Sequence, residues 1–112
     1  MEGSVIMDRS IETIDKNNDI RIRVVGKIQA VDEKTGTFEL VDGSFKLTCL
    51  PPVNQTTVPV KNESVVVSGK IAHAGNDEFE LRTEHLEKIS EKEYGEYHKY
   101  LKLRWELLNN GS

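Results

Sequence analysis

The chain has 112 residues, which suffices for one domain but not two. Hydrophobic residues make up 37%, charged residues 30%, and the net charge is −4, a balance that excludes a disordered chain. No apolar run reaches the length of a membrane span, and the amino terminus lacks a signal-peptide pattern, so we expect no membrane contact. The single cysteine, Cys49, excludes an internal disulfide and indicates a reducing, intracellular compartment.

The charge is unevenly distributed along the chain. Residues 1–19 carry five acidic and two basic side chains, whereas residues 20–88 and 89–112 are nearly neutral. Domains that bind nucleic acid through bulk electrostatics are usually strongly basic. Any contact with DNA or RNA would therefore need a local patch.

A long first strand is predicted over residues 20–30. Its even positions are apolar or small, and its odd positions include Arg21, Arg23 and Lys27, as expected for a strand with one wet face. Gly26 in the middle suggests a bulge or a sharp bend.

Two shorter strands follow and are joined by a tight turn. Phe38 and Leu40 alternate with polar residues in the second strand, as do Leu47 and Cys49 in the third. The Asp-Gly pair at positions 42–43 is a strong hairpin signal. The first three strands are therefore predicted to form a meander.

The rest of the barrel follows a short linker. Pro51 and Pro52 end the third strand, and residues 54–61 are too polar and too few for a substantial helix. A fourth strand contains Gly69 between β-branched residues, and a turn at residues 75–77 leads into a fifth. This order fits an all-β, five-stranded OB-fold Greek-key barrel with a terminal helix. An SH3-like barrel is the alternative.

The alternation of each strand predicts which side chains point into the barrel. We expect replacement of Phe45 by alanine to destabilise the fold by about 3–5 kcal/mol. The predicted core comprises Val24, Ile28, Phe38, Leu40, Phe45, Leu47, Val67, Ile71 and Leu81.

A terminal helix is predicted from its end signals. Residues 90–93 read Ser-Glu-Lys-Glu, a capping box, with Ile89 and Tyr94 placed as a hydrophobic staple. Asn110-Gly111 supplies the stop. Gly95 within the helix suggests a close packing contact.

The chain thus divides into an OB barrel with a short amino-terminal arm over residues 1–88 and an oligomerisation helix over 89–112. Isoleucines at positions 6, 11 and 14 of the arm are compatible with a helical turn.

The helix has more apolar surface than one small barrel covers. At about 100° per residue its apolar side chains span an arc of about 200°, against the 100° or so that a helix on a globular core needs. All three tyrosines and the only tryptophan lie here, and these residue types are enriched at interface hot spots. We predict that Tyr100, Leu103 and Leu107 face the barrel or arm and that the opposite side meets partner helices. The predicted partner interface is Tyr94, Tyr97, Tyr100, Leu101, Trp105 and Leu108.

Catalysis finds little support in the sequence. His73, His85 and His98 are scattered, with no nucleophile elbow and no phosphate-binding loop. One cysteine and three dispersed histidines do not make a metal site. We therefore expect that the protein is not an enzyme and that it binds no cofactor and no metal.

OB barrels often bind single strands through outward aromatic side chains and basic residues. The three barrel phenylalanines share their faces with core leucines, so they are expected in the core rather than on a stacking platform. A weak nucleic-acid contact is predicted at Arg21, Arg23, Lys27 and Lys46. The alternative is a solvated strand face whose basic residues pair with nearby acids.

The order of these features resembles the small subunit of replication protein A. The resemblance rests on the acidic arm, the Val-Gly-Lys-Ile at 25–28, the strand-turn-strand at 38–43, the helix-free linker, the strand at 65–71 and the Tyr-rich helix. Telomere-associated paralogues, including one attached to ciliate telomerase, have similar small subunits. A telomere-capping complex of related architecture also contains a small OB subunit.

The resemblance implies a non-catalytic scaffold subunit of a heterotrimeric single-stranded-DNA-binding complex in the nucleus, acting in DNA replication, DNA repair or telomere maintenance. It implies that the terminal helix joins helices of two larger OB-fold subunits, and that DNA is contacted mainly by those partners. Two alternatives remain: a free-standing OB module that binds a single strand, and a homo-oligomeric adaptor without a link to nucleic acid.

Overall fold

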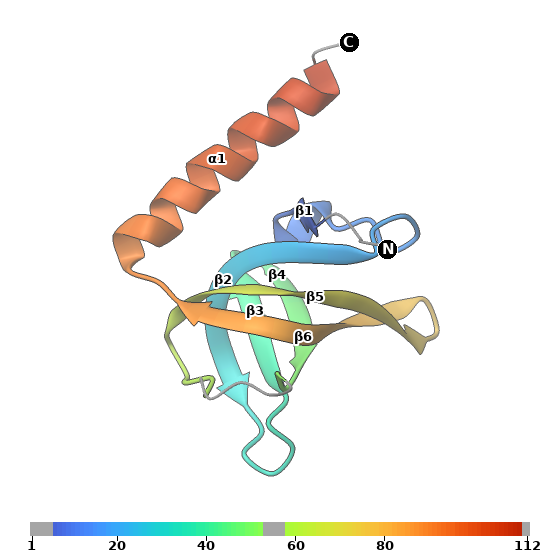
Figure 1. Cartoon of the computed structure of the whole chain (residues 1–112), viewed down its shortest axis with the longest axis vertical. Coiled ribbons are helices and arrows are strands. Elements are labelled where there is room, and N and C mark those ends of the chain that lie inside the picture. Colours follow the sequence, from blue (N-terminus) through green and yellow to red (C-terminus); the bar gives the residue numbers. More distant parts are fainter. Residues whose placement is uncertain (1–5, 53–57, 111–112) are drawn as a thin grey trace.

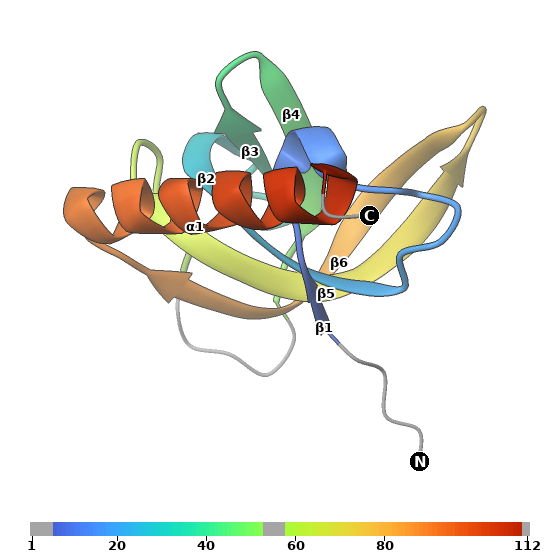
Figure 2. The ribbon, with the colours of Figure 1, turned by 90° about the horizontal axis from the view of Figure 1, so that it is seen from above.

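The protein is a closed barrel with one long helix leaning over it (Figures 1 and 2). The structure, a computed structural model, describes residues 6–52 and 58–110. The elements are β1 (Ile6–Asp8), a 3-10 turn η1 (Ile11–Thr13), β2 (Arg21–Val31), β3 (Phe38–Asp42), β4 (Phe45–Leu50), β5 (Ser64–Gly75), β6 (Glu78–Lys88) and α1 (Glu91–Asn110). No helix in these two ranges is long and apolar enough to cross a membrane.

The long strand β2 belongs to both halves of the barrel. It pairs antiparallel with β5 from Arg21 to Lys27 and antiparallel with β3 from Lys27 to Val31. The barrel closes where β4 runs parallel to β6, with Cys49 opposite Leu81. Five strands closed in this way confirm the predicted OB fold.

Most of the predicted core is buried, with two departures. Phe45 is 43% exposed, so its assignment to the core was wrong, whereas Ile71 is half-buried and packs against the core. Phe45 is in phase with Leu47 but is the first residue after the β3–β4 turn, where it lies opposite Asp42. Alternation gives the direction of a side chain but not whether the barrel still encloses that level. The fully buried predicted residues are Val24, Ile28, Phe38, Leu40, Leu47, Val67 and Leu81.

Two glycines allow strands to approach closely, in different ways. The pairing of β5 with β6 is irregular at Ser68 and Gly69, and a Cβ at Gly69 would overlap the carbonyl oxygen of Arg82. The bulge expected at Gly26 is absent there, since β2 pairs regularly with β5 through this residue. A Cβ at Gly26 would instead lie 2.6 Å from Cγ of Leu40. The irregularity of β2 falls further along, in its pairing with β3 between Ile28 and Ala30.

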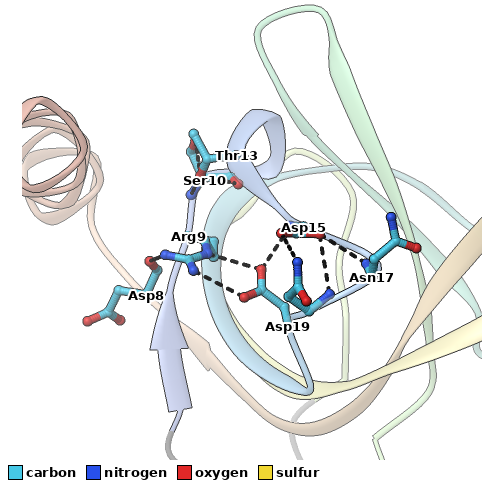
Figure 3. Close-up of polar contacts among 8 residues, drawn as sticks. Asp8, Arg9, Ser10, Thr13, Asp15, Asn17 and Asp19 are labelled. Atoms are coloured by element: carbon cyan, nitrogen blue, oxygen red, sulfur yellow. Dashed lines mark hydrogen bonds and ion pairs between the residues drawn. The ribbon is translucent and has the colours of Figure 1, made fainter. Parts of the chain in front are cut away.

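The amino-terminal arm is part of the barrel rather than a loose extension. Strand β1 pairs in parallel with the start of β2, and η1 places Ile11, 7% exposed, in the main core. Arg9 donates to Asp19 twice, from Nε to Oδ2 at 3.0 Å and from Nη2 to Oδ1 at 3.1 Å (Figure 3). The expected helical turn is present as η1, while the three residues of β1 were too few to show a period.

The helix begins as its capping box predicts. The backbone N–H of Ser90 donates to Oε1 of Glu93 at 2.9 Å, and that of Glu93 donates to Oγ of Ser90 at 3.1 Å. Ile89 and Tyr94, the predicted staple, pack against the same small cluster. The helix ends at Asn110, and Gly111 of the predicted stop lies outside the described residues. The close contact expected at Gly95 is not found, because a Cβ there would have no described neighbour within 4 Å.

Candidate functional site

The first half of α1 rests on the barrel. Leu101, 8% exposed, packs with Val25 of β2 and Val66 of β5, and Tyr94 and Tyr97 flank this contact. From there the helix continues away from β6 toward the side of the arm (Figures 1 and 2).

The face that meets the barrel is the reverse of the one we predicted. Tyr94, Tyr97 and Leu101 point toward the barrel, whereas Tyr100, Leu103 and Leu107 are 48%, 59% and 67% exposed. The spacing of apolar residues defines an arc on the helix but not its orientation. That orientation is set by where β6 ends and by contacts with residues far away in the sequence.

Polar contacts fix the start of the helix on the barrel. Oδ1 of Asp42, at the end of β3, accepts a hydrogen bond from the Tyr94 hydroxyl at 3.2 Å and lies 2.9 Å from Nε2 of His98. Burial, followed by the nearby charge of Asp42, raises the pKa of Tyr94 to about 12. His98 therefore faces the barrel.

A second contact holds the first turn of the helix. Glu91 accepts a hydrogen bond from Oγ of Ser64 at 2.7 Å and forms an ion pair with Lys27 at 3.0 Å. Nζ of Lys27 also lies 5.6 Å from the centre of the Tyr94 ring. Lys27, predicted to contact nucleic acid, therefore binds the helix to the barrel.

The rest of the helix presents an apolar surface to solvent. We call Tyr100, Leu103, Leu107 and Leu108 the outer helix face; its three leucines are each at least 59% exposed. Steps of three and four residues along Tyr100, Leu103 and Leu107 form one stripe on a helix, the pattern by which helices pack on one another. Of the predicted interface residues, Tyr100, Trp105 and Leu108 are exposed, while the other three lie toward the barrel.

Arg21, Arg23 and Lys27 form a basic stripe on β2, and each of them pairs with an acidic side chain. Arg21 donates two hydrogen bonds to Glu84, at 2.7 and 2.8 Å, and Arg23 pairs with Asp8 at 2.7 Å. The Arg21 hydrogen bond lowers the pKa of Glu84, so the carboxylate stays charged at neutral pH. With Lys27 bound to Glu91, all three basic residues of the stripe have an acidic partner, as the alternative interpretation held.

The face that OB folds commonly use for ligands is acidic in this chain. A groove between β4 and the β5–β6 hairpin is lined by Lys46 on one side and by Asp77, Glu78 and Glu80 on the other. Phe79, at its edge, packs against the core. Asp77 also lies 3.9 Å from Nζ of Lys16, but Glu78 and Glu80 remain against one lysine of the groove, a balance that disfavours a phosphate backbone. Lys46 is exposed, as predicted, but has no second cation beside it among the lining residues.

Neither a metal-binding cluster nor an accessible thiol is found among the described residues. Over residues 6–52 and 58–110, no three His, Cys, Asp or Glu side chains are grouped so that they could hold a metal ion. Cys49 is fully buried, and burial raises the pKa of its thiol, which keeps it in the unreactive protonated form.

Similarity to known proteins is found at the level of structure. No protein-family model and no curated protein sequence matches this chain. The telomere capping protein Ten1 from Saccharomyces pombe matches 91% of this chain and 99% of its own, with 21% identity and a TM-score of 0.73. A chain of the S. pombe Stn1-Ten1 complex matches 94% of this chain and 96% of its own, with 19% identity and a TM-score of 0.74.

A chain of a replication protein A heterotrimer bound to single-stranded DNA is also similar in structure. It matches 80% of this chain and 74% of its own, with 11% identity and a TM-score of 0.64. At these identities the likeness is one of fold. A match over 94% of the chain must also include most of the twenty residues of α1. The chain is therefore an OB-fold protein whose barrel and terminal helix together resemble a small telomere-capping protein in structure.

Proposed function

We propose that this chain is a non-catalytic small subunit of a single-stranded-DNA-binding complex in the nucleus, joined to larger OB-fold partners through α1. The observation that carries the proposal is the outer helix face, on which three leucines of one helix are each at least 59% exposed. Exposed apolar stripes of this kind mark protein interaction sites. The ion-paired basic stripe and the acidic groove support a subunit that leaves most DNA contacts to its partners.

The fold neighbours favour two versions of this function. The likeness to Ten1, and to a chain of the Stn1-Ten1 complex, supports a subunit of a telomere-capping complex. The likeness to a chain of the replication protein A heterotrimer supports a scaffold for two larger subunits in replication or repair. The match covers 94% of this chain in the first case and 80% in the second, which favours the telomere-capping version.

Partner capture by the full chain tests the proposal. We expect larger OB-fold proteins that bind single-stranded DNA to co-purify with the tagged chain. Replacing both Leu103 and Leu107 with glutamate should remove them, because the charges would be buried against a partner helix. The matched control replaces Ile20 and Val58 with glutamate. These residues are 65% and 64% exposed but lie off the helix, so the control should retain the partners. If the control variant lost the partners while the Leu103 and Leu107 variant kept them, the proposal would be contradicted.

The number of partners separates the two versions. A single larger partner in a one-to-one complex supports the telomere-capping version, and two larger partners support the replication protein A type.

We also propose that residues 1–88 and 89–112 have separate roles. A chain ending at Lys88 should retain the circular dichroism of a folded barrel, weakened by exposure of Val25 and Val66, and should lose its partners. If this shortened chain still bound its partners at full strength, the interface would lie on the strands.

The rival is a free-standing OB module that binds a single strand through Arg21, Arg23, Lys27 and Lys46. Fluorescence anisotropy of a labelled oligonucleotide, titrated with salt, separates the two. The proposal expects weak binding by the isolated chain with a shallow dependence on salt, because three of these four residues already have acidic partners and few are left to contact phosphates. Sub-micromolar binding at physiological salt would support the rival instead.

A further inference from the structure

A groove lies between the second half of α1 and the amino-terminal arm. The helix contributes Leu101, Lys102, Trp105 and Glu106 to its lining, and the barrel side contributes Glu12 of η1 and Asp42 of β3. Figure 2 shows the carboxyl-terminal turns of α1 passing over the 3-10 turn. We propose that this groove receives an arginine side chain of the partner subunit, an inference that rests on the proposed function for the source of that arginine.

The charge of the groove favours a cation. Three carboxylates, those of Glu12, Asp42 and Glu106, line it together with Lys102 and His98, so the acidic side chains outnumber the lysine. Both described contacts of Asp42, from Tyr94 and His98, engage Oδ1, so Oδ2 can accept from a further donor. The Asp42 carboxylate is 14% exposed, which shields an ion pair formed there from water and salt.

The remaining walls favour arginine over a small cation. Leu101 is 8% exposed and gives the groove an apolar wall for the methylene stem of a long side chain. The Trp105 indole is 45% exposed and offers a flat aromatic surface. A guanidinium group stacks on aromatic rings and donates two parallel hydrogen bonds to a carboxylate, whereas an ammonium group cannot do both in this way.

The position of the groove connects it to the outer helix face. Leu108 follows Trp105 by three residues, so the two side chains lie one turn apart on neighbouring parts of the helix surface, whereas Leu103 and Leu107 lie on the other side of the helix. A partner helix that packs on Leu108 at the edge of the outer helix face would therefore pass the groove within reach of a long side chain. The carboxylates of Glu12 and Glu106, on meeting a guanidinium at this edge, would set the register of the partner, as charge pairs at interface edges commonly do.

Titration of the isolated full chain with a short peptide tests the inference. The probe is N-acetyl-Ala-Arg-Ala-amide, and the comparators carry citrulline, which is neutral and of the same shape, or lysine. Trp105 is the only tryptophan of the chain, so its fluorescence and its indole N–H resonance are assigned to this groove residue without ambiguity. We expect a saturable change with the arginine peptide, with a dissociation constant on the order of 1 mM for one side chain. The citrulline and lysine peptides should bind at least threefold more weakly.

Charge variants give the second readout. Replacing both Glu12 and Glu106 with glutamine should weaken binding of the arginine peptide at least threefold, whereas Lys102→Gln should strengthen it. The control Glu33→Gln, in the exposed turn between β2 and β3, should have no effect. An equal response to citrulline, or unchanged binding by the double glutamine variant, would overturn the inference.

Failure of the groove and failure of the proposed function are distinguishable. If the peptide does not bind but OB-fold partners still co-purify through the outer helix face, only the groove assignment is wrong. If the peptide binds but no such partner co-purifies, only the proposed function is wrong.

Discussion

The barrel buries its apolar side chains, whereas the helix leaves most of its own exposed to solvent. Inside the barrel, Ile22, Leu40, Val65, Val67 and Leu81 are completely buried. Along α1, Leu101 is the one apolar side chain buried among those described, and four apolar residues stay on the outer helix face. The barrel therefore accounts for most of the folding free energy, and the helix leaves apolar surface exposed to solvent.

The largest loss of stability is expected from shortening a side chain in the barrel core. Phe38 is 1% exposed, so Phe38→Ala should reduce the free energy of unfolding by about 3–5 kcal/mol. Phe45→Ala is the matched control and should cost about 1 kcal/mol, since Phe45 is 43% exposed. Urea denaturation measures both. Equal losses would mean that Phe45 belongs to the core after all.

Substitutions on the two sides of the helix should also differ in their cost to stability, but by less than those in the barrel. Leu101→Ala should cost about 2 kcal/mol, the low end for a buried leucine, because its cluster with Val25 and Val66 is small. Leu107→Ala should change stability by less than about 0.5 kcal/mol, because Leu107 is 67% exposed. Thermal unfolding of the isolated chain checks this. A large loss for Leu107→Ala would show that the outer helix face is covered by the chain itself.

Substitution of Gly95 is expected to stabilise the protein rather than destabilise it. A Cβ there would meet no described atom within 4 Å, so Gly95→Ala should raise stability by about 1 kcal/mol through helix propensity. Gly26→Ala is the contrasting variant and should destabilise, because its Cβ would lie 2.8 Å from the carbonyl oxygen of Val41. Weaker partner binding by Gly95→Ala, despite a more stable helix, would indicate that the partner approaches the helix closely there.

The last test concerns pH and the contact of Tyr94 with Asp42. Burial raises the pKa of Tyr94 from 10.0 to about 12, so the folded state retains a proton that the unfolded state loses. This contribution is complete below pH 10 and is lost as the pH rises toward 12. The stability of the wild type should therefore fall more steeply between pH 10 and 12 than that of Tyr94→Phe. Parallel curves for the two proteins would contradict the raised pKa.

Several features of the fold were determined by the sequence alone because they depend on neighbours within a few residues. Alternation placed Phe38, Leu40 and Leu47 in the core, and the capping box at Ser90 and Glu93 fixed the start of α1. These signals are local, since strand and helix periods and end caps extend over at most a few turns.

Tertiary structure decided what distant parts of the chain do to one another. The partners of Arg21 and Lys27 are Glu84 and Glu91, sixty or more residues away, and no local pattern identifies them. The same is true of β1, which exists because it pairs with β2, and of Phe45, which the end of the barrel leaves exposed. The apolar arc of α1 predicted that the helix has more apolar surface than the barrel covers, and the exposed leucines agree with this. Which side rests on the barrel was decided by Val25, Val66 and Asp42, because only packing against a defined surface orients a helix about its own axis.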